Sequence, residues 1–236
     1  MRLDKYAAFA AASRKEIKNL ILKGRVTVNG MVIRDSGFSV NEKDIVALDG
    51  NKIYYREFIY IMMNKPAGII SATFDPVHKT VIDLLPEELK RFEPFPVGRL
   101  DIDTEGLLLL TNDGKLAHNL LSPTKKVPKV YEATVDGKIT KKHIEIFKNG
   151  IILDDGYKTK PSTLSVLKED SNTVAQVMIT EGKNHQVKRM FADIGLHVLY
   201  LKRVKFAKLA LDNSLKSGDF RELYVEEMNI LNNIMQ

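Results

Sequence analysis

The chain has 236 residues, 44% of them hydrophobic, so it can bury a sizeable core in one large domain or two smaller ones. It contains no cysteine, which excludes disulfides, thiolate nucleophiles and cysteine-bound metal centres. Its net charge of +6 favours a polyanionic partner, and no stretch approaches the roughly 20 apolar residues of a membrane-spanning helix. We therefore expect a cytoplasmic protein that does not bind membranes.

Residues 1–48 have the pattern of a small separate module. Apolar residues recur at helical spacing near the N-terminus, and Ser13 with Glu16 forms a capping box that predicts the start of a second helix. Asn29 and Gly30 lie between two short β-branched runs, which is a strong signal for a β-hairpin. The expected local structure is a helix pair followed by small strands.

Positive charge is concentrated in this module, which has nine basic and five acidic residues and therefore a net charge of about +4. Basic residues lie off the apolar face of the second predicted helix and at its end, where they are placed to contact phosphates. A solvated helix face with a cation near the helix C-terminus explains the same pattern. The charge pattern alone leaves both interpretations open.

The stretch RLDKYAAFAAASRKEIKNLILKGRVTVNGMVI, residues 2–33, closely resembles the small RNA-binding module named after a ribosomal small-subunit protein. Its distinctive marks are the RLDK opening, the Ser13-Arg14 helix start and the segment from Gly24 to Gly30. In that family the helix pair binds structured RNA. The resemblance implies an RNA-binding role for the basic residues of this segment, which are Arg2, Lys5, Arg14, Lys15, Lys18, Lys23 and Arg25.

Residues 49–57, DGNKIYYRE, are polar and lack sustained periodicity, which predicts a linker. Residues 58–236 mix strand and helix patterns without the regular alternation of a doubly wound fold. We therefore predict a small N-terminal α/β module followed by a larger α+β domain with a mixed, largely antiparallel sheet. Strands are expected within 58–71 and at 106–111, 130–137, 162–169, 173–180 and 197–206, and helices at 115–121, 141–150 and 184–195.

The segment GRLDIDTEGLLLLTNDG, residues 98–114, places Asp101 and Asp103 directly before a leucine run typical of a buried strand. Gly98 allows close approach of a substrate, and Arg99 can stabilise an anion, so Asp101 is suited to act as a nucleophile. An Arg–Asp surface turn explains the same spacing, and Asp103 is a competing candidate. The chain has no Gly-rich phosphate loop, dinucleotide fingerprint, metal-binding histidine pair or nucleophile elbow, which leaves a carboxylate as the candidate reactive group.

This segment is very similar to the signature of pseudouridine synthases, specifically the ribosomal small-subunit uridine branch. The resemblance implies that Asp101 is the catalytic nucleophile and that Arg99 binds substrate. In KVPKVYEATVDG the tyrosine that stacks on the target base corresponds to Tyr131, and in EGKNHQVKRMF the basic residue that pairs with the aspartate corresponds to Lys188. The stretches MNKPAG and RVKFAKLAL are also family-like, although the second has Ala207 where glycine is expected.

Ordinary structural roles also explain two of these residues when the pattern is considered alone. Tyr131 fits an aromatic residue on a half-buried strand. Lys188 lies off the apolar stripe of its predicted helix, so it also fits a solvated lysine.

The resemblance spans essentially the whole chain and implies isomerisation of a specific uridine to pseudouridine in ribosomal RNA. We expect the small-subunit (16S) rRNA, in a pre-ribosomal particle, to be the substrate of a monomer that needs no metal or other cofactor. The GRLDIDT wording, the compact N-terminus and the lack of a long basic C-terminal tail favour this branch. Two alternatives are a synthase for large-subunit rRNA and a non-catalytic rRNA-binding or assembly protein. The joint presence of Asp101, Tyr131 and Lys188 opposes the non-catalytic alternative.

Overall fold

The computed structural model describes all residues except 11–13, 42 and 236. The chain forms two compact units, residues 1–57 and residues 58–236. Each unit has its own hydrophobic core.

The first unit packs a helical segment against a small antiparallel sheet. Its elements are α1 (Leu3–Tyr6), the 3-10 helix η1 (Ala7–Ala10), α2 (Arg14–Leu22), β1 (Val26–Val28), β2 (Met31–Val32), β3 (Val46–Leu48) and β4 (Asn51–Ile53), with strand order β2-β1-β3-β4. The predicted hairpin is confirmed, because β1 pairs with β2 and both turn residues, Asn29 and Gly30, have positive φ angles of 52° and 82°. The expected helix cap at Ser13 lies outside the described residues.

The prediction of a linker over all of residues 49–57 is wrong for its central part. Asn51–Ile53 forms β4, which pairs antiparallel with β3, and Ile53 is buried in the core of the first unit. Asp49 and Gly50 have φ angles of 50° and 80° and form the turn between β3 and β4. The sequence signal was missed because a three-residue edge strand is too short to show a period of two.

The second unit is built on a mixed nine-stranded sheet with helices on both faces. Strand order is β13-β5-β7-β11-β8-β10-β9, with β6 paired to β7 and β12 paired to β11. The strands are β5 (Tyr60–Lys65), β6 (Phe95–Pro96), β7 (Glu105–Thr111), β8 (Lys129–Val135), β9 (Thr163–Glu169), β10 (Thr173–Ile179), β11 (Val198–Phe206), β12 (Leu209–Ala210) and β13 (Phe220–Glu222). The helices are α3 (Glu87–Lys90), α4 (Gly114–Leu121), α5 (Lys141–Asn149), α6 (Gln186–Asp193) and α7 (Val225–Met235).

The pairing confirms the predicted α+β fold with a largely antiparallel sheet. The strand pairs of this sheet are antiparallel except β7 with β11, which run parallel with Glu105 beside Lys202 and Gly106 beside Arg203. Gly106 has a φ of 103°, and a Cβ atom there would lie 2.3 Å from the carbonyl oxygen of Arg203. The two backbones can approach this closely only because the residue is glycine.

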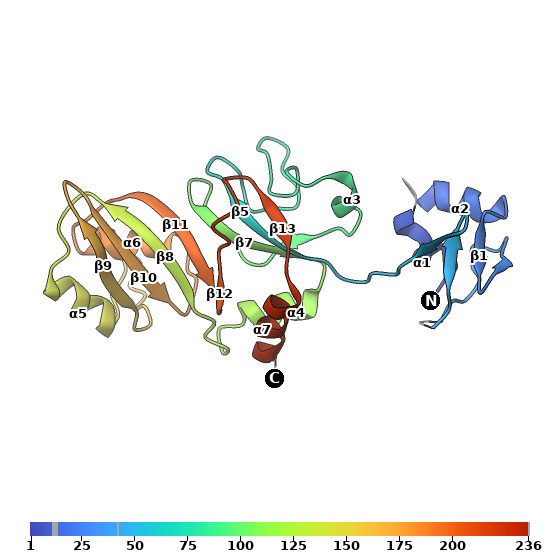
Figure 1. Ribbon diagram of the computed structural model, residues 1–236. Coiled ribbons are helices and arrows are strands. Elements are labelled where there is room, and N and C mark those ends of the chain that lie inside the picture. The colour runs from blue at the N-terminus through green and yellow to red at the C-terminus, as the bar shows by residue number, and fades with distance from the viewer. Residues whose placement is uncertain (11–13, 42, 236) are drawn as a thin grey trace. The chain divides into compact units, whose positions relative to one another are not determined.

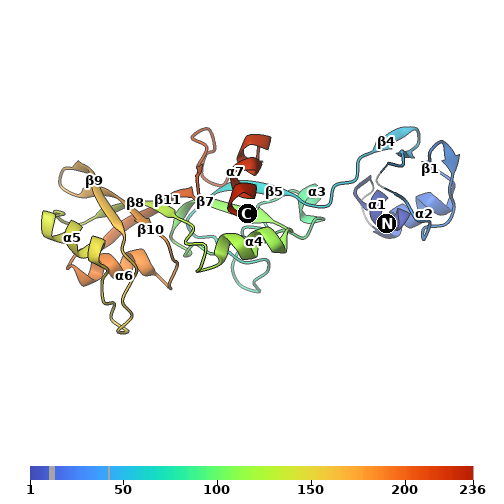
Figure 2. The ribbon, with the colours of Figure 1, turned by 90° about the horizontal axis from the view of Figure 1, so that it is seen from below.

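The leucine run of β7 is buried on both faces of the sheet. Leu108 and Leu110 belong to the core cluster that also contains Val81 and Leu85 from the segment before β6, and Leu107 and Leu109 belong to the core beneath α4 and α7. Figures 1 and 2 show α4 and α7 side by side, whereas α5 and α6 lie next to β8, β9 and β10. A strand covered on both faces needs a continuous apolar run instead of alternation, which explains the four leucines. No helix in the described part of the chain is long and apolar enough to cross a membrane.

Candidate active site

Asp101 lies on the loop that leads into β7, and this loop is fixed by residues that follow β5. Ser71 exchanges two hydrogen bonds with the backbone of Leu100, at 3.0 and 3.1 Å. The backbone N–H of Gly68 donates to the carbonyl of Ile102 at 2.7 Å. The loop therefore positions Asp101 through backbone contacts on both sides of the residue.

Lys65, at the end of β5, also holds the loop that carries Asp101 through hydrogen bonds. Its side chain is fully buried, and Nζ donates to the carbonyls of Pro66 and Thr104 at 2.9 Å and of Ile102 at 3.3 Å. Burial lowers the pKa of Lys65 to about 8, although nearby carboxylates, Asp103 first among them, act in the opposite direction. The stretch MNKPAGIIS thus forms the support for the loop that carries Asp101.

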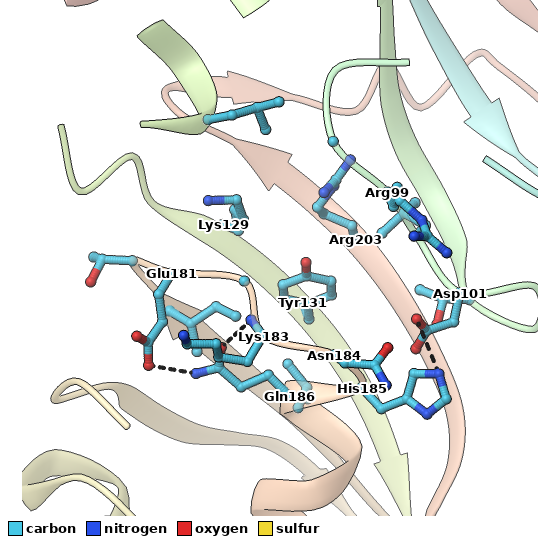
Figure 3. Close-up of a pocket in the computed structure, with 18 of the residues that line it drawn as sticks. Arg99, Asp101, Lys129, Tyr131, Glu181, Lys183, Asn184, His185, Gln186 and Arg203 are labelled. Atoms are coloured by element: carbon cyan, nitrogen blue, oxygen red, sulfur yellow. Dashed lines mark hydrogen bonds and ion pairs between the residues drawn. The ribbon is translucent and has the colours of Figure 1, made fainter. Parts of the chain in front are cut away.

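Helix α6 and the loop before it bring basic groups to Asp101. Lys188 Nζ lies 2.5 Å from Asp103 Oδ1 and 3.5 Å from Asp101 Oδ2, so this lysine contacts both carboxylates and is nearer to Asp103. The hydrogen bond from Lys188 holds the pKa of Asp103 below its usual range. His185 Nε2 lies 3.7 Å from Asp101 Oδ1 (Figure 3). Asp101 is about one quarter exposed, which leaves its carboxylate accessible.

Asp101 opens into a pocket of about 540 Å³ that is lined by residues from several strands and loops. Arg99 and Tyr131 line the same pocket, and Tyr131 lies between Asp101 and Lys129 in Figure 3. Tyr131 is 8% exposed and also contributes to the core, so one part of its ring surface is fixed by packing. An aromatic ring in a pocket wall offers a surface on which a base can stack.

A buried carboxylate, Glu181, shapes the opposite rim of the pocket. Its oxygens accept hydrogen bonds from Tyr157 Oη at 2.7 Å, the Lys160 backbone at 2.9 Å and Gln186 Nε2 at 2.8 Å. Gln186 in turn accepts from the Lys183 backbone at 2.9 Å. This network ties the loop before α6 to the segment before β9 and so fixes the position from which His185 and Lys188 project.

The site combines an accessible carboxylate, nearby cations, an aromatic surface and a partly enclosed pocket. These are the parts needed to hold an anionic nucleophile next to a base that has been taken out of its stack. Among the described residues, no group of three or more histidine, aspartate or glutamate side chains is arranged to hold a metal ion.

Residues 59–193 match the family described as RNA pseudouridylate synthase, and residues 1–46 match the S4 domain. The chain belongs to the RNA pseudouridylate synthase family. It is therefore an RNA pseudouridine synthase with an N-terminal S4 domain, and the non-catalytic alternative is set aside.

Members of this family from several bacteria align with nearly the full chain. An uncharacterised RNA pseudouridine synthase of Bacillus subtilis, YtzG, is 49% identical over 98% of both chains. The ribosomal large subunit pseudouridine synthase B of B. subtilis is 41% identical over 98% of this chain and 95% of its own. The ribosomal small subunit pseudouridine synthase A of Escherichia coli K12 is 38% identical over 97% and 98%. A crystal structure of a pseudouridylate synthase covers 98% of this chain and 99% of its own with a TM-score of 0.70 and 31% identity.

The structure brings the four predicted catalytic-domain residues together. Asp101, Arg99 and Tyr131 line one pocket, and Lys188 reaches Asp101 from α6. The expectation that Lys188 pairs with Asp101 omitted Asp103, which is its nearer partner.

Several predicted cations of the S4 domain are engaged by carboxylates. Arg2 and Lys18 both contact Asp4, at 2.9 and 3.7 Å, and Arg25 forms a two-point ion pair with Asp49. All three basic side chains are at least half exposed. The remaining predicted cations are Lys5, Lys15 and Lys23, which are exposed, and Arg14, whose side chain lies outside the described part of the chain.

Sequence reasoning missed five residues of the site. Lys65 belongs to the family-like MNKPAG stretch, but nothing in the pattern indicated that its amine is buried. Lys129 could have been found, because it is two residues before Tyr131 and so faces the same side of β8. The others depend on tertiary contacts and are Glu181, His185 and Arg203.

Proposed function

We propose that this synthase isomerises a uridine in ribosomal RNA with Asp101 as the nucleophile. The observation that carries the proposal is the Asp101 carboxylate, accessible in the pocket and within 3.7 Å of both a lysine and a histidine nitrogen. In the reaction the C1′–N1 bond breaks and a C1′–C5 bond forms, while C5 loses a proton and N1 gains one. A carboxylate can attack covalently or promote departure of the uracil, and both routes need it ionised and close to the nucleotide.

We assign supporting roles to three other residues. Tyr131 would stack on the target base after it leaves the RNA stack, which its place in the pocket wall supports. Lys188 would stabilise the negative charge of the Asp101 carboxylate during the reaction, which the 3.5 Å distance between Lys188 Nζ and Asp101 Oδ2 supports. Arg99 would bind the substrate from the exposed side of the same loop.

The proposed substrate is small-subunit (16S) rRNA, in a pre-ribosomal particle, with the monomer as the active species in the cytoplasm. The small-subunit synthase of E. coli, 38% identical over nearly the whole chain, and the GRLDIDT wording support this target. Large-subunit rRNA is the second candidate, because the large-subunit synthase of B. subtilis is 41% identical over a similar length.

Pseudouridine mapping in total rRNA from cells with and without this gene distinguishes the two targets. Loss of one pseudouridine in 16S rRNA is the expected result. Loss confined to 23S rRNA would assign the chain to the large subunit, and an unchanged rRNA pattern would overturn the ribosomal target.

The role of Asp101 is tested with a matched pair of variants from the same loop. Asp101→Asn should abolish tritium release from RNA that carries uridine labelled at C5, because an amide has a similar shape but is not an anionic nucleophile. Asp103→Asn, at the exposed neighbouring carboxylate, should retain most of the activity. Substantial turnover by a clean Asp101→Asn preparation would rule out the assignment, and the reverse pattern would move the role to Asp103.

A further inference from the structure

The pocket wall beyond Tyr131, on the side away from Asp101, is cationic. Lys129 is two residues before Tyr131 on β8, so both side chains face the same side of the sheet. Arg203 on β11 is the cross-strand partner of Tyr131, and Lys160 comes from the segment before β9. All three basic residues line the pocket. Figure 3 shows Lys129 on the far side of Tyr131 from Asp101, and Arg203 beside the ring, between Lys129 and Arg99.

Arg203 has an unused hydrogen-bonding nitrogen. The residue is 1% exposed, and Nε donates to the carbonyl of Leu107 at 2.8 Å. Its Nη2 atom is buried and has no hydrogen-bond partner among the described residues. A guanidinium group keeps its charge in proteins, and a buried donor without an acceptor is costly. The arrangement is therefore completed when a ligand supplies an acceptor.

Lys129 adds a partly buried cation next to the fully buried Arg203. Both groups flank the ring of Phe206, with Lys129 Nζ 5.6 Å and the Arg203 guanidinium carbon 5.0 Å from its centroid. Burial, and then the charges of Arg203 and Lys160, lower the pKa of Lys129 to about 8. Its amine donates to the carbonyl of Val127 at 3.1 Å.

The negative charge in this part of the pocket is already engaged. Glu181 opposes the lowered pKa of Lys129, but its two oxygens accept hydrogen bonds from Tyr157, Gln186 and the Lys160 backbone. The wall beyond Tyr131 therefore has an excess of positive charge. An anionic ligand would offset that excess, whereas a neutral uracil ring would not.

We propose that Lys129 and Arg203, with Lys160 beside them, bind a phosphodiester group of the RNA strand next to the target uridine. This subsite rests on the proposed function, in which the target base lies against Tyr131 and its sugar faces Asp101. Residues two apart on a strand are about 7 Å apart, a separation that one nucleotide can span between its base and a flanking phosphate. Arg203 would donate its free Nη2 to a phosphate oxygen, and Lys129 would contribute charge.

The test uses the full chain and a short, fluorescein-labelled single-stranded RNA with one central uridine. Three forms of this RNA are compared by fluorescence anisotropy at fixed ionic strength. One has native linkages, one has a neutral methylphosphonate 5′ of the uridine, and one has it 3′ of the uridine. Neutralising one of these two linkages should weaken binding to the wild type about tenfold, as expected for loss of a charge-assisted hydrogen bond. The sensitive position identifies the phosphate.

Lys129→Gln should bind the native RNA more weakly than the wild type does. It should also show a smaller difference between the native and the neutralised RNA, because Arg203 alone still contacts the phosphate. Lys129→Arg, which keeps the charge, should retain the distinction. Lys141→Gln, at an exposed lysine on α5, is the matched control and should behave as wild type. If circular dichroism shows that Lys129→Gln is unfolded, Arg203→Lys and Lys160→Gln replace it. Each of these variants should show a smaller difference than the wild type between its affinities for the native and the neutralised RNA.

Equal sensitivity to the neutral linkage in wild type and Lys129→Gln would overturn the subsite, as would a wild type that does not distinguish the three RNAs. The binding comparison does not depend on Asp101 as the nucleophile. Asp101→Asn should show the same difference in affinity between the native and the neutralised RNA as the wild type. Turnover by Asp101→Asn would overturn the proposed function without changing the binding comparison.

Discussion

The amine of Lys65 and the carbonyl oxygen of Thr104 are 2.9 Å apart, so a fully buried cation on β5 is bonded to the backbone that follows Asp101. The same amine also donates to the carbonyl of Ile102. Lys65 does not line the pocket, so it can affect Asp101 only through its hydrogen bonds to this backbone. Its role is therefore to position the carboxylate.

Lys65→Met should slow the chemical step and leave RNA binding nearly unchanged. The variant keeps the apolar stem but leaves three carbonyls without their shared donor, so the Asp101 loop loses its fixed position. A displacement of about 1 Å at a reacting group can cost about 10²-fold in rate. Single-turnover tritium release at saturating RNA measures this effect, with Lys141→Met as control. If Lys65→Met reacted at the wild-type rate, the hydrogen bonds of Lys65 would not be needed to position Asp101.

The lowered pKa of Lys65 also predicts a pH dependence of stability. The ordinary value is 10.5 and the folded value is about 8, so between these values the folded protein binds fewer protons than the unfolded chain. The stability contribution of this group must then rise as pH increases from about 8 toward 10.5, and below pH 8 the cost of burying the charge is fully present.

The free energy of unfolding of wild type should therefore increase relative to that of Lys65→Met across this pH window. Urea titrations of both proteins at several pH values provide the measurement. Lys129 has a similarly lowered pKa, but it is present in both proteins and its contribution cancels. If the difference in the free energy of unfolding between the two proteins stayed constant with pH, the pKa of Lys65 would not be lowered by folding.

Lys188→Met should impair catalysis far more than folding. The side chain lies off the buried face of α6, so we expect a change in stability within about 0.5 kcal/mol. Loss of the charge next to Asp101 should lower the single-turnover rate by about 10²-fold, with partial rescue in Lys188→Arg. Carbon NMR of the carboxyl groups should show the pKa of Asp103 moving up toward its ordinary value. An unchanged rate at saturating RNA would limit Lys188 to a structural contact.

Residues 58–236 should fold without the S4 domain and bind RNA more weakly. The two units have separate hydrophobic cores, and the core of residues 1–57 shares no residue with the two core clusters of residues 58–236. Removing the cluster of exposed lysines and arginines should also reduce the salt dependence of binding. Circular dichroism and filter binding at several salt concentrations test both statements. If affinity and salt slope were those of the full chain, the S4 domain would not contribute to docking.

The local patterns that the sequence predicted well are those with a short-range physical cause. The hairpin at Asn29–Gly30 follows from two residues that accept positive φ, and the buried strand at 106–111 follows from a continuous apolar run. In the second unit, helices α3 and α7 and strands β6, β12 and β13 were not predicted. The sequence of α7 has a weaker amphipathic pattern than α6, and its position depends on packing against α4.

The site was predictable where a motif indicated it and was missed where distant segments meet. Asp101, Tyr131 and Lys188 come from motifs, whereas the buried amine of Lys65 and the free nitrogen of Arg203 depend on strand pairing. Ala207, where a glycine was expected, has a φ of 56°, so an alanine occupies a backbone conformation that glycine adopts without strain. The expected glycine therefore had a conformational reason that the sequence alone did not give.

Asp101 precedes β7 and Tyr131 lies on β8, and these two strands flank β11 on opposite sides. The join between β7 and β11 depends on Gly106, where any added side-chain carbon would meet the backbone of Arg203. A mutation at this glycine would therefore pull the carboxylate away from the aromatic ring without altering either residue. During divergence of the lineage, purifying selection should act on this codon as strictly as on that of the proposed nucleophile, although its residue has no side chain to take part in the chemistry.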